Sequence, residues 1–201
     1  MRNVPERLRA RRLTREAAGE EGFTLIELLV VLLIIGILLA IAIPTFLSVT
    51  KSANNTAAQA NLQTALTGAD TFYTNANQTY SGIDMSTNAG VSDITQIDTG
   101  LTYVSGAIST GPNVISLYTN GSSALELVAW SKGTRDCWVV VDLKATATAA
   151  YAGLSGTQAA GTYYGVERNT PSSNCKATSS ATMPGGGTST GAMQTSGFPA
   201  G

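Results

Sequence analysis

Histidine is absent from this chain of 201 residues, so the commonest general base and the commonest metal ligand of proteins are both missing. The sequence also lacks a phosphate-binding glycine loop, a nucleophile elbow and a metalloprotease motif. These absences argue against an enzyme, a metal centre and a bound cofactor. Any step driven by ATP hydrolysis would therefore need a separate protein.

Charged residues are scarce, at 12% of the chain against about 25% in ordinary soluble domains. The net charge of −1 gives the chain as a whole no strong attraction to nucleic acid, which stays an open partner that the composition does not indicate. The charges are unevenly placed, because residues 1–22 carry a net of +2 and residues 23–201 a net of −3. A basic head on a slightly acidic body is typical of a topology signal rather than of a binding surface.

Cysteine occurs only twice, at Cys137 and Cys175, which is too few for a four-ligand zinc site within one chain. If this part of the chain lies outside the cytoplasm, a disulfide between the two is the natural interpretation, and two unpaired buried thiols are the alternative. The chain-entropy model gives such a bridge roughly 4 kcal/mol of stabilisation. Its role would be structural.

An almost wholly apolar run occupies residues 23–47, and its 25 residues would extend about 37 Å as a helix. That length exceeds the hydrocarbon core of a bilayer, about 30 Å, and the run is longer than the apolar core of a secretory signal, about 7–15 residues. Six arginines precede the run and Lys51 follows it closely. The positive-inside rule then predicts a single-pass protein with a cytoplasmic N-terminus and an external body.

Residues 48–80 have the pattern of an amphipathic helix that continues the apolar run. One apolar stripe with spacings of four and three residues comprises Leu62, Leu66, Ala69, Tyr73, Ala76 and Tyr80. The opposite face is rich in Asn, Gln and Thr and has almost no charge. We therefore expect the run and this segment to form one long helix.

The rest of the chain is predicted to form a glycine-containing connecting loop at 81–100, a β domain at 101–176 and a flexible Gly/Ser/Thr-rich tail at 177–201. The loop contains a candidate short helix at 92–97. The expected strands lie at 101–108, 113–119, 124–130, 137–143 and 162–167, with turns at Gly111-Pro112 and Asn120-Gly121. A long helix followed by a meander of strands predicts an α+β fold, with an antiparallel sheet packed on one face of the helix.

Glu27 is the only charged residue within the apolar run, and a carboxylate in the membrane costs at least about 2.5 kcal/mol. No basic side chain within the run can pair with it. Cleavage after Gly22 would create a partner, because Phe23 would then carry a free ammonium group. An ammonium on one subunit and Glu27 on another could neutralise each other and fix the axial register of an assembly. A charge tolerated near the lipid interface is the alternative.

The segment from Gly22 to Glu27, followed at once by the apolar run, resembles the class III signal sequence of type IV prepilins and type II secretion pseudopilins. In that family a membrane peptidase cuts after the glycine and methylates the new N-terminus. The resemblance implies that Gly22 is the cleavage residue, Phe23 the methylated residue and Glu27 the assembly residue. It covers roughly residues 19–50, and the leader of residues 1–22 is longer than in the commonest class of pilins.

Gly36 and Pro44 also stand where pilins often have residues that loosen the helix, although Pro44 could equally be a simple kink. The resemblance implies the type IV pilin fold, in which a long N-terminal helical spine, membrane-spanning in its first half, packs on an antiparallel sheet. It also implies that the subunit leaves the lipid bilayer for a helical homo-oligomeric filament on the cell surface. The implied partners are a prepilin peptidase and methylase, an inner-membrane assembly platform and a separate assembly ATPase.

The function implied by the resemblance is that of a pilus subunit for adhesion, motility or DNA uptake. Three alternatives stay open from the sequence. A pseudopilin of a secretion or competence system would form a shorter filament. A membrane-anchored binding domain would never polymerise, and an anchored hydrolase would need a catalytic arrangement that the sequence does not display.

Overall fold

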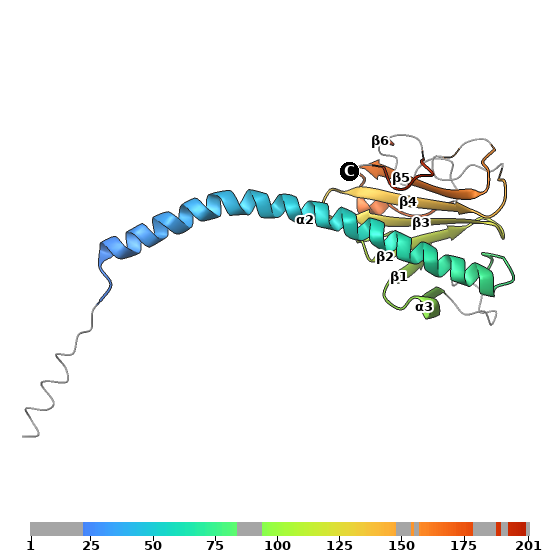
Figure 1. Cartoon of the computed structure of the whole chain (residues 1–201), viewed down its shortest axis with the longest axis horizontal. Coiled ribbons are helices and arrows are strands. Elements are labelled where there is room, and N and C mark those ends of the chain that lie inside the picture. The colour runs from blue at the N-terminus through green and yellow to red at the C-terminus, as the bar shows by residue number, and fades with distance from the viewer. Residues whose placement is uncertain are drawn as a thin grey trace, which may run out of the picture. The chain divides into compact units, whose positions relative to one another are not determined.

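The computed structural model describes residues 22–83, 94–147, 154, 157–178, 188–189 and 193–199 (Figure 1). The chain divides into two compact units, one ending at Phe46 and the other beginning at Leu47. One helix, α2 (Leu25–Asn75), belongs to both units. The leader proposed for residues 1–22 lies outside the described residues except for Gly22.

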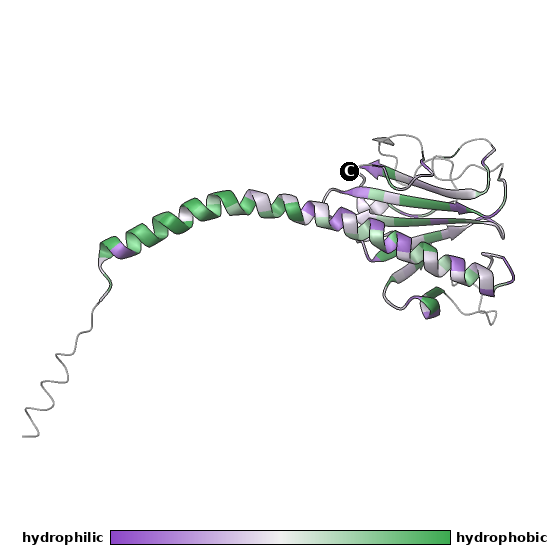
Figure 2. Ribbon diagram, in the orientation of Figure 1, coloured by the Kyte–Doolittle hydropathy of each residue, from purple (hydrophilic) through white to green (hydrophobic). Residues whose placement is uncertain are grey.

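In the first unit, α2 is apolar on all sides after the charged residue of its first turn, as its largely green colouring in Figure 2 shows. Its large apolar side chains are exposed throughout, from Leu25 at 80% to Leu47 at 56% at the start of the second unit. Among the described residues, α2 alone is long and apolar enough to cross a membrane. Apolar surface of this extent is stable only in lipid or against other apolar chains.

In the second unit, α2 buries one stripe against a sheet. The buried helical residues are Ala58, Leu62, Ala65, Leu66, Gly68, Ala69 and Phe72. Apart from Gly68, they form one core cluster with strand residues such as Leu127 and Val140. The helix ends at Asn75, five residues before the end of the expected apolar stripe, because Asn77 takes a left-handed conformation (φ 54°). The Gln78 N–H then donates to the Tyr73 carbonyl at 2.9 Å and closes the helix C-terminus.

Within the described residues, six strands form one sheet in the order β1-β2-β3-β4-β5-β6. Their bounds are β1 (Thr102–Ser105), β2 (Val114–Thr119), β3 (Ala124–Ser131), β4 (Asp136–Leu143), β5 (Gly161–Arg168) and β6 (Thr188–Ser189). Neighbours from β2 onward are antiparallel. The fold is therefore α+β, with a long N-terminal helix packed on a mostly antiparallel sheet.

The first strand departs from the expected meander, because β1 pairs with β2 in parallel, from Thr102 opposite Val114 to Ser105 opposite Leu117. The link between the two strands returns along the sheet and is held by the buried Ser109. The Ser109 hydroxyl donates to the Val114 carbonyl at 2.6 Å and accepts a hydrogen bond from the Trp130 N–H at 2.8 Å. The expectation of an antiparallel pair at this point was wrong.

Both faces of the sheet are covered, and every residue of β4 is buried. The face opposite α2 forms a second core cluster that includes Val139, Val141, Leu154 and Ala177. A disulfide joins Cys137 in β4 to Cys175, with their Cα atoms 5.6 Å apart. This bond fastens the segment that follows the short helix η1 (Ser172–Asn174) to the face of the sheet.

Described residues near the C-terminus pack on the sheet, although the sequence predicted a flexible tail over 177–201. β6 pairs with β5, and the backbones of Gln194 and Tyr164 hydrogen-bond to each other. The ring of Phe198 makes edge contacts with Trp138 and Tyr164 at centroid distances of 5.6 and 5.0 Å. The Phe198 ring thus packs on the sheet although the average composition around it is that of a linker.

The loop expected at 81–100 contains the short helix α3 (Ile94–Ile97), whose Ile94 is buried in the main core. Its residues 84–93 lie outside the described part of the chain.

Candidate functional site

The first turn of α2 is closed by a reciprocal hydrogen-bonded pair, Thr24 and Glu27. The Thr24 N–H and hydroxyl both donate to Glu27 Oε2 at 2.8 Å. The Glu27 N–H lies 3.3 Å from the Thr24 hydroxyl oxygen, which accepts from it. This is a capping box, in which a Thr at the N-cap and a Glu three residues later satisfy N–H groups that the helix cannot. The sequence pattern Thr-x-x-Glu signals this intramolecular role of Glu27, which adds to the intermolecular role predicted for the residue.

Gly22 and Phe23 precede the helix in an open segment. Neither belongs to a helix or strand, both are exposed, and Phe23 is 81% exposed. A Cβ added at Gly22 would meet no heavy atom within 4 Å. Within the described residues, the peptide bond between these two residues is therefore sterically accessible from outside the chain.

Gly36 and Pro44 lie inside α2, which continues through both. A Cβ at Gly36 would meet nothing within 4 Å, so the first unit gives no packing reason for a residue that costs a helix about 1 kcal/mol relative to alanine. A glycine on a membrane helix does allow another helix to approach closely. Pro44 has no N–H to offer the preceding turn, and the Thr45 hydroxyl donates to the Ile41 carbonyl at 2.6 Å.

The structure brings together some of the residues that the sequence singled out. Cys137 and Cys175 are bonded, and Glu27 meets Thr24. Phe23, Gly36 and Pro44 occupy separate positions along or before the helix. No group of His, Cys, Asp and Glu residues capable of holding a metal ion occurs in the part of the chain that the structure describes.

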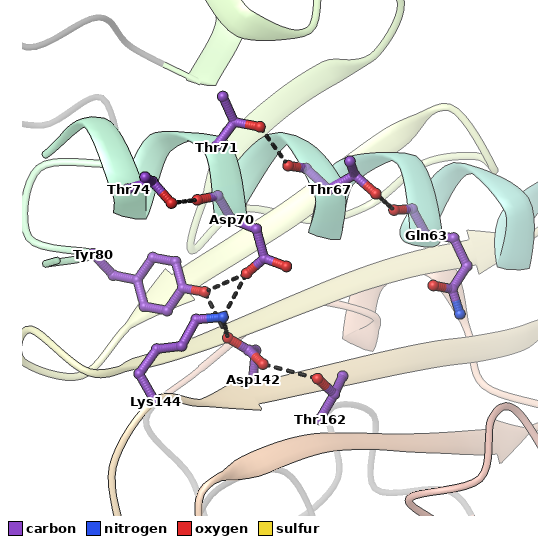
Figure 3. A network of polar contacts seen from close by, with 9 residues as sticks. All are labelled: Gln63, Thr67, Asp70, Thr71, Thr74, Tyr80, Asp142, Lys144 and Thr162. Atoms are coloured by element: carbon purple, nitrogen blue, oxygen red, sulfur yellow. Dashed lines mark hydrogen bonds and ion pairs between the residues drawn. The ribbon is translucent and has the colours of Figure 1, made fainter.

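Four polar residues fasten the second unit's helix to the sheet, and we call them the Lys144 clasp: Asp70, Tyr80, Asp142 and Lys144 (Figure 3). Lys144 Nζ lies 2.6 Å from Asp70 Oδ1 and 3.0 Å from Asp142 Oδ2. The Tyr80 hydroxyl donates to Asp142 Oδ2 at 2.5 Å and lies 3.2 Å from Asp70 Oδ1. One cation thus holds two carboxylates from distant parts of the chain.

The electrostatics of the Lys144 clasp favour the charged lysine. Burial lowers the pKa of Lys144, but the hydrogen bonds and charges of Asp70 and Asp142 outweigh it and raise that pKa overall. Burial, aided by Asp142, also raises the pKa of the Tyr80 hydroxyl, which therefore stays protonated as a donor. The sequence gives no local signal for the clasp, because its members are up to 74 residues apart.

The turn between β3 and β4 is packed tightly on α2. A Cβ added at Gly133 would lie 2.7 Å from the Lys51 Cα and 3.0 Å from its carbonyl oxygen. Beside it, Asn55 Oδ1 accepts hydrogen bonds from the Thr134 hydroxyl at 2.6 Å and from the Trp138 ring nitrogen at 3.3 Å. Only a residue without a side chain allows this approach of turn to helix.

Replacing Gly133 by alanine is therefore expected to lower the free energy of unfolding by about 1–3 kcal/mol, the usual cost of overpacking. Urea unfolding of the full chain in detergent would measure it. Gly111→Ala is the matched control, because a Cβ there would meet its nearest neighbour, Asn113 Oδ1, at an ordinary 3.6 Å. Equal losses in the two variants would contradict the tight contact at Lys51.

Glu126 is a buried carboxylate on the face of the sheet opposite α2, with 1% of its surface exposed. Neither of its oxygens has a hydrogen-bond partner of good geometry among the described residues. Burial raises the pKa of Glu126 to about 8, against a smaller lowering by the nearby Thr178 N–H. At neutral pH the folded chain therefore favours the protonated form.

Glu126→Gln is expected to remove a pH dependence of stability. The folded chain holds a proton that the unfolded chain releases above pH 4.5, so wild-type stability falls as pH rises from there to about 8. Between pH 5 and 7 the loss should be roughly 2.5 kcal/mol, whereas the glutamine variant should change little. Urea titrations of both proteins at both pH values would measure this difference. As the internal control, the wild type and the glutamine variant should have similar stabilities at pH 5. Parallel pH curves would be inconsistent with a protonated Glu126.

The sequence Gly-Phe-Thr-x-x-Glu stands at the start of a helix that is apolar on all sides. The same helix continues into an α+β domain and packs there on a sheet. Together these features define a class of proteins with one long N-terminal helix and a C-terminal sheet domain. Residues 18–43 match the family model described as the prokaryotic N-terminal methylation motif. A fimbrial protein of Pseudomonas aeruginosa is 34% identical over 111 residues, which are 55% of this chain and 68% of that protein. This chain belongs to the type IV pilin family.

Two further relatives are similar over shorter stretches. The type IV major pilin protein PilA of Myxococcus xanthus is 42% identical over 62 residues, 31% of this chain and 28% of that protein. The type IV narrow pilus major component PilA5 of Thermus thermophilus is 44% identical over 63 residues, 31% of this chain and 51% of that protein. The chain thus spans about a quarter and about half of these two relatives. No solved structure matches it.

Proposed function

We propose that this chain is a non-enzymatic structural subunit that polymerises into a type IV pilus. The observation that carries the proposal is the exposure of every large apolar side chain from Leu25 to Leu47 on one helix. Such a surface suits two successive environments, the bilayer before assembly and the packed helices of other subunits afterwards. Its relatives, named as pilus components, support the same role.

Processing of the precursor would take place at the open segment before α2. A prepilin peptidase would hydrolyse the bond between Gly22 and Phe23, releasing residues 1–22, and would methylate the new amino group. The accessibility of this bond and the match of residues 18–43 to the methylation motif support the assignment. The new terminus at Phe23 would be a cation four residues before Glu27.

Glu27 would then pair with the Phe23 ammonium of a neighbouring subunit. All hydrogen bonds to its carboxylate from described residues end on Oε2, so the cap at Thr24 holds the side chain in place and leaves Oε1 to face a partner. Pairing neutralises both groups in an apolar environment and sets the axial position of the incoming subunit. Gly36 and Pro44 would let the spine adapt to its neighbours.

The proposed route begins in the plasma membrane, with the N-terminus cytoplasmic and the domain outside, and ends in a surface filament. An assembly platform and an ATPase, both separate proteins, would extract the subunit. Adhesion, twitching motility and DNA uptake are the activities that such a filament would serve.

Mass spectrometry of protein sheared from the cell surface tests the proposal. We expect a chain that begins with N-methylated Phe23 and lacks residues 1–22. A chain that retains residues 1–22, or one cut after the apolar run, would refute processing as a prepilin and leave an anchored or secreted domain.

A further inference from the structure

Three exposed cations gather where α2 enters the second unit: Lys51 on the helix, and Lys132 and Arg135 on the turn between β3 and β4. We call them the basic collar. The tight contact between Gly133 and the Lys51 backbone places the turn beside the helix at this level. The Arg135 N–H donates to the Ser131 carbonyl at 2.9 Å and closes the turn. The collar is therefore built on a fixed scaffold.

The collar is unneutralised within the described residues. The ion pairs there join Lys144 to Asp70 and Asp142, and Arg168 to Asp136. None of them involves a collar cation. The collar thus concentrates positive charge at one end of a domain that is otherwise slightly acidic.

The position of the collar along α2 matches the headgroup layer of a bilayer. Lys51 follows the end of the apolar run at Leu47 by four residues on one continuous helix, which is about 6 Å of rise. The headgroup region on each side of the hydrocarbon core is about 5–8 Å thick. Phosphate groups therefore lie at the depth of Lys51 when residues 23–47 span the membrane.

We propose that Lys51, Lys132 and Arg135 bind the phosphate groups of anionic lipids at the outer surface of the membrane while the subunit awaits assembly. The proposal rests on the membrane-spanning precursor described above. Each Lys or Arg near an anionic surface strengthens the attraction roughly fivefold. The collar would hold the domain against the bilayer until extraction, and its release would be one of the steps of assembly.

A second copy of the chain is a less suitable partner, because the described carboxylates of its sheet-bearing unit are already engaged or buried. Asp70 and Asp142 belong to the Lys144 clasp and Asp136 pairs with Arg168. Asp98 accepts hydrogen bonds from Gly100 and Tyr103. The described surface of a second copy therefore presents few carboxylates to the basic collar. A leaflet that contains anionic lipid presents many phosphate groups to it.

The test uses the full chain, one copy per nanodisc, in phosphatidylcholine alone or with about one lipid in three replaced by phosphatidylglycerol. Amide hydrogen exchange is measured over residues 131–135 and over residues 25–47. We expect exchange in the turn to slow roughly fivefold in the anionic discs and to recover in 1 M salt, where the screening length is about 3 Å. K132Q/R135Q should abolish the difference, and the control K176Q, at another exposed lysine, should preserve it.

The outcomes distinguish a failure of the lipid-binding proposal for the collar from a failure of the proposed function. Protected exchange at residues 25–47 with equal turn exchange in both lipids would overturn the collar and leave the spanning helix intact. Unprotected exchange at residues 25–47 would overturn the membrane-inserted precursor itself. Slowing of the turn only with two chains per disc, in either lipid, would assign the collar to a second subunit instead.

Discussion

Replacing Glu27 by glutamine is expected to leave the precursor in the membrane and to reduce the yield of surface filaments roughly a hundredfold. Glutamine can still accept the Thr24 hydrogen bonds, because Gln serves as well as Glu at this position of a capping box. It cannot neutralise the ammonium at Phe23 of a neighbouring subunit. An uncompensated charge in an apolar interface costs about 3–5 kcal/mol, and the lower end of that range corresponds to a loss of roughly a hundredfold.

Thr24→Val is the matched control, because it removes the hydroxyl of the cap and keeps the charge of Glu27. Its filament yield should fall by no more than the few-fold effect that a weakened cap produces, about 1 kcal/mol. Immunoblots of sheared filaments and of the membrane fraction measure both variants. Normal filaments from Glu27→Gln together with few from Thr24→Val would show that Glu27 acts as a cap and that the charge pairing is wrong.

Lys144→Met is expected to lower the free energy of unfolding of the sheet domain by about 3 kcal/mol. The variant leaves the Asp142 side chain, only 5% exposed, facing Asp70 without a cation. This expected loss of stability is at the lower end of the range for buried ion pairs that lose one partner. The reason is that the Asp70 side chain is 48% exposed, so water can partly solvate its charge. Urea unfolding of the full chain in detergent would measure the loss.

A second substitution tests the cause of that loss. Asp142→Asn in the Lys144→Met background should recover part of the stability, because it removes the buried charge while a polar group still faces Tyr80. Lys176→Met should leave stability unchanged, since Lys176 is exposed. Unaltered unfolding of Lys144→Met would mean that the Lys144 clasp contributes nothing net to the fold.

Periodicity and apolar length were sufficient to predict the long helix and its packing on a sheet. The buried stripe containing Leu62, Leu66 and Ala69 is the one that the spacing indicated. The parallel pairing of β1 with β2 could not be predicted from the sequence, because the direction of a strand depends on the path of the link that connects it to its neighbour. That path is set by the hydrogen bonds of Ser109, a residue without any distinctive local signal.

The polar contacts were predictable only where they are local. Thr24 and Glu27 are three residues apart and their capping pattern can be read directly. Asp70 and Lys144 have no such signal, because their meeting depends on how the helix lies on the sheet. Glu126 occupies an ordinary strand position, and nothing nearby in sequence reveals that the far face of the sheet is also covered.

The disulfide between Cys137 and Cys175 has a mechanical consequence for a subunit under tension. The two residues are 38 positions apart, so the bond encloses about 130 Å of extended chain. Pulling on the helix and on residues beyond Cys175 cannot release that length, even if β4 and β5 separate. In the proposed filament, the covalent loop would therefore limit how far a subunit can lengthen under tension, and reduction of this one bond would free the enclosed length.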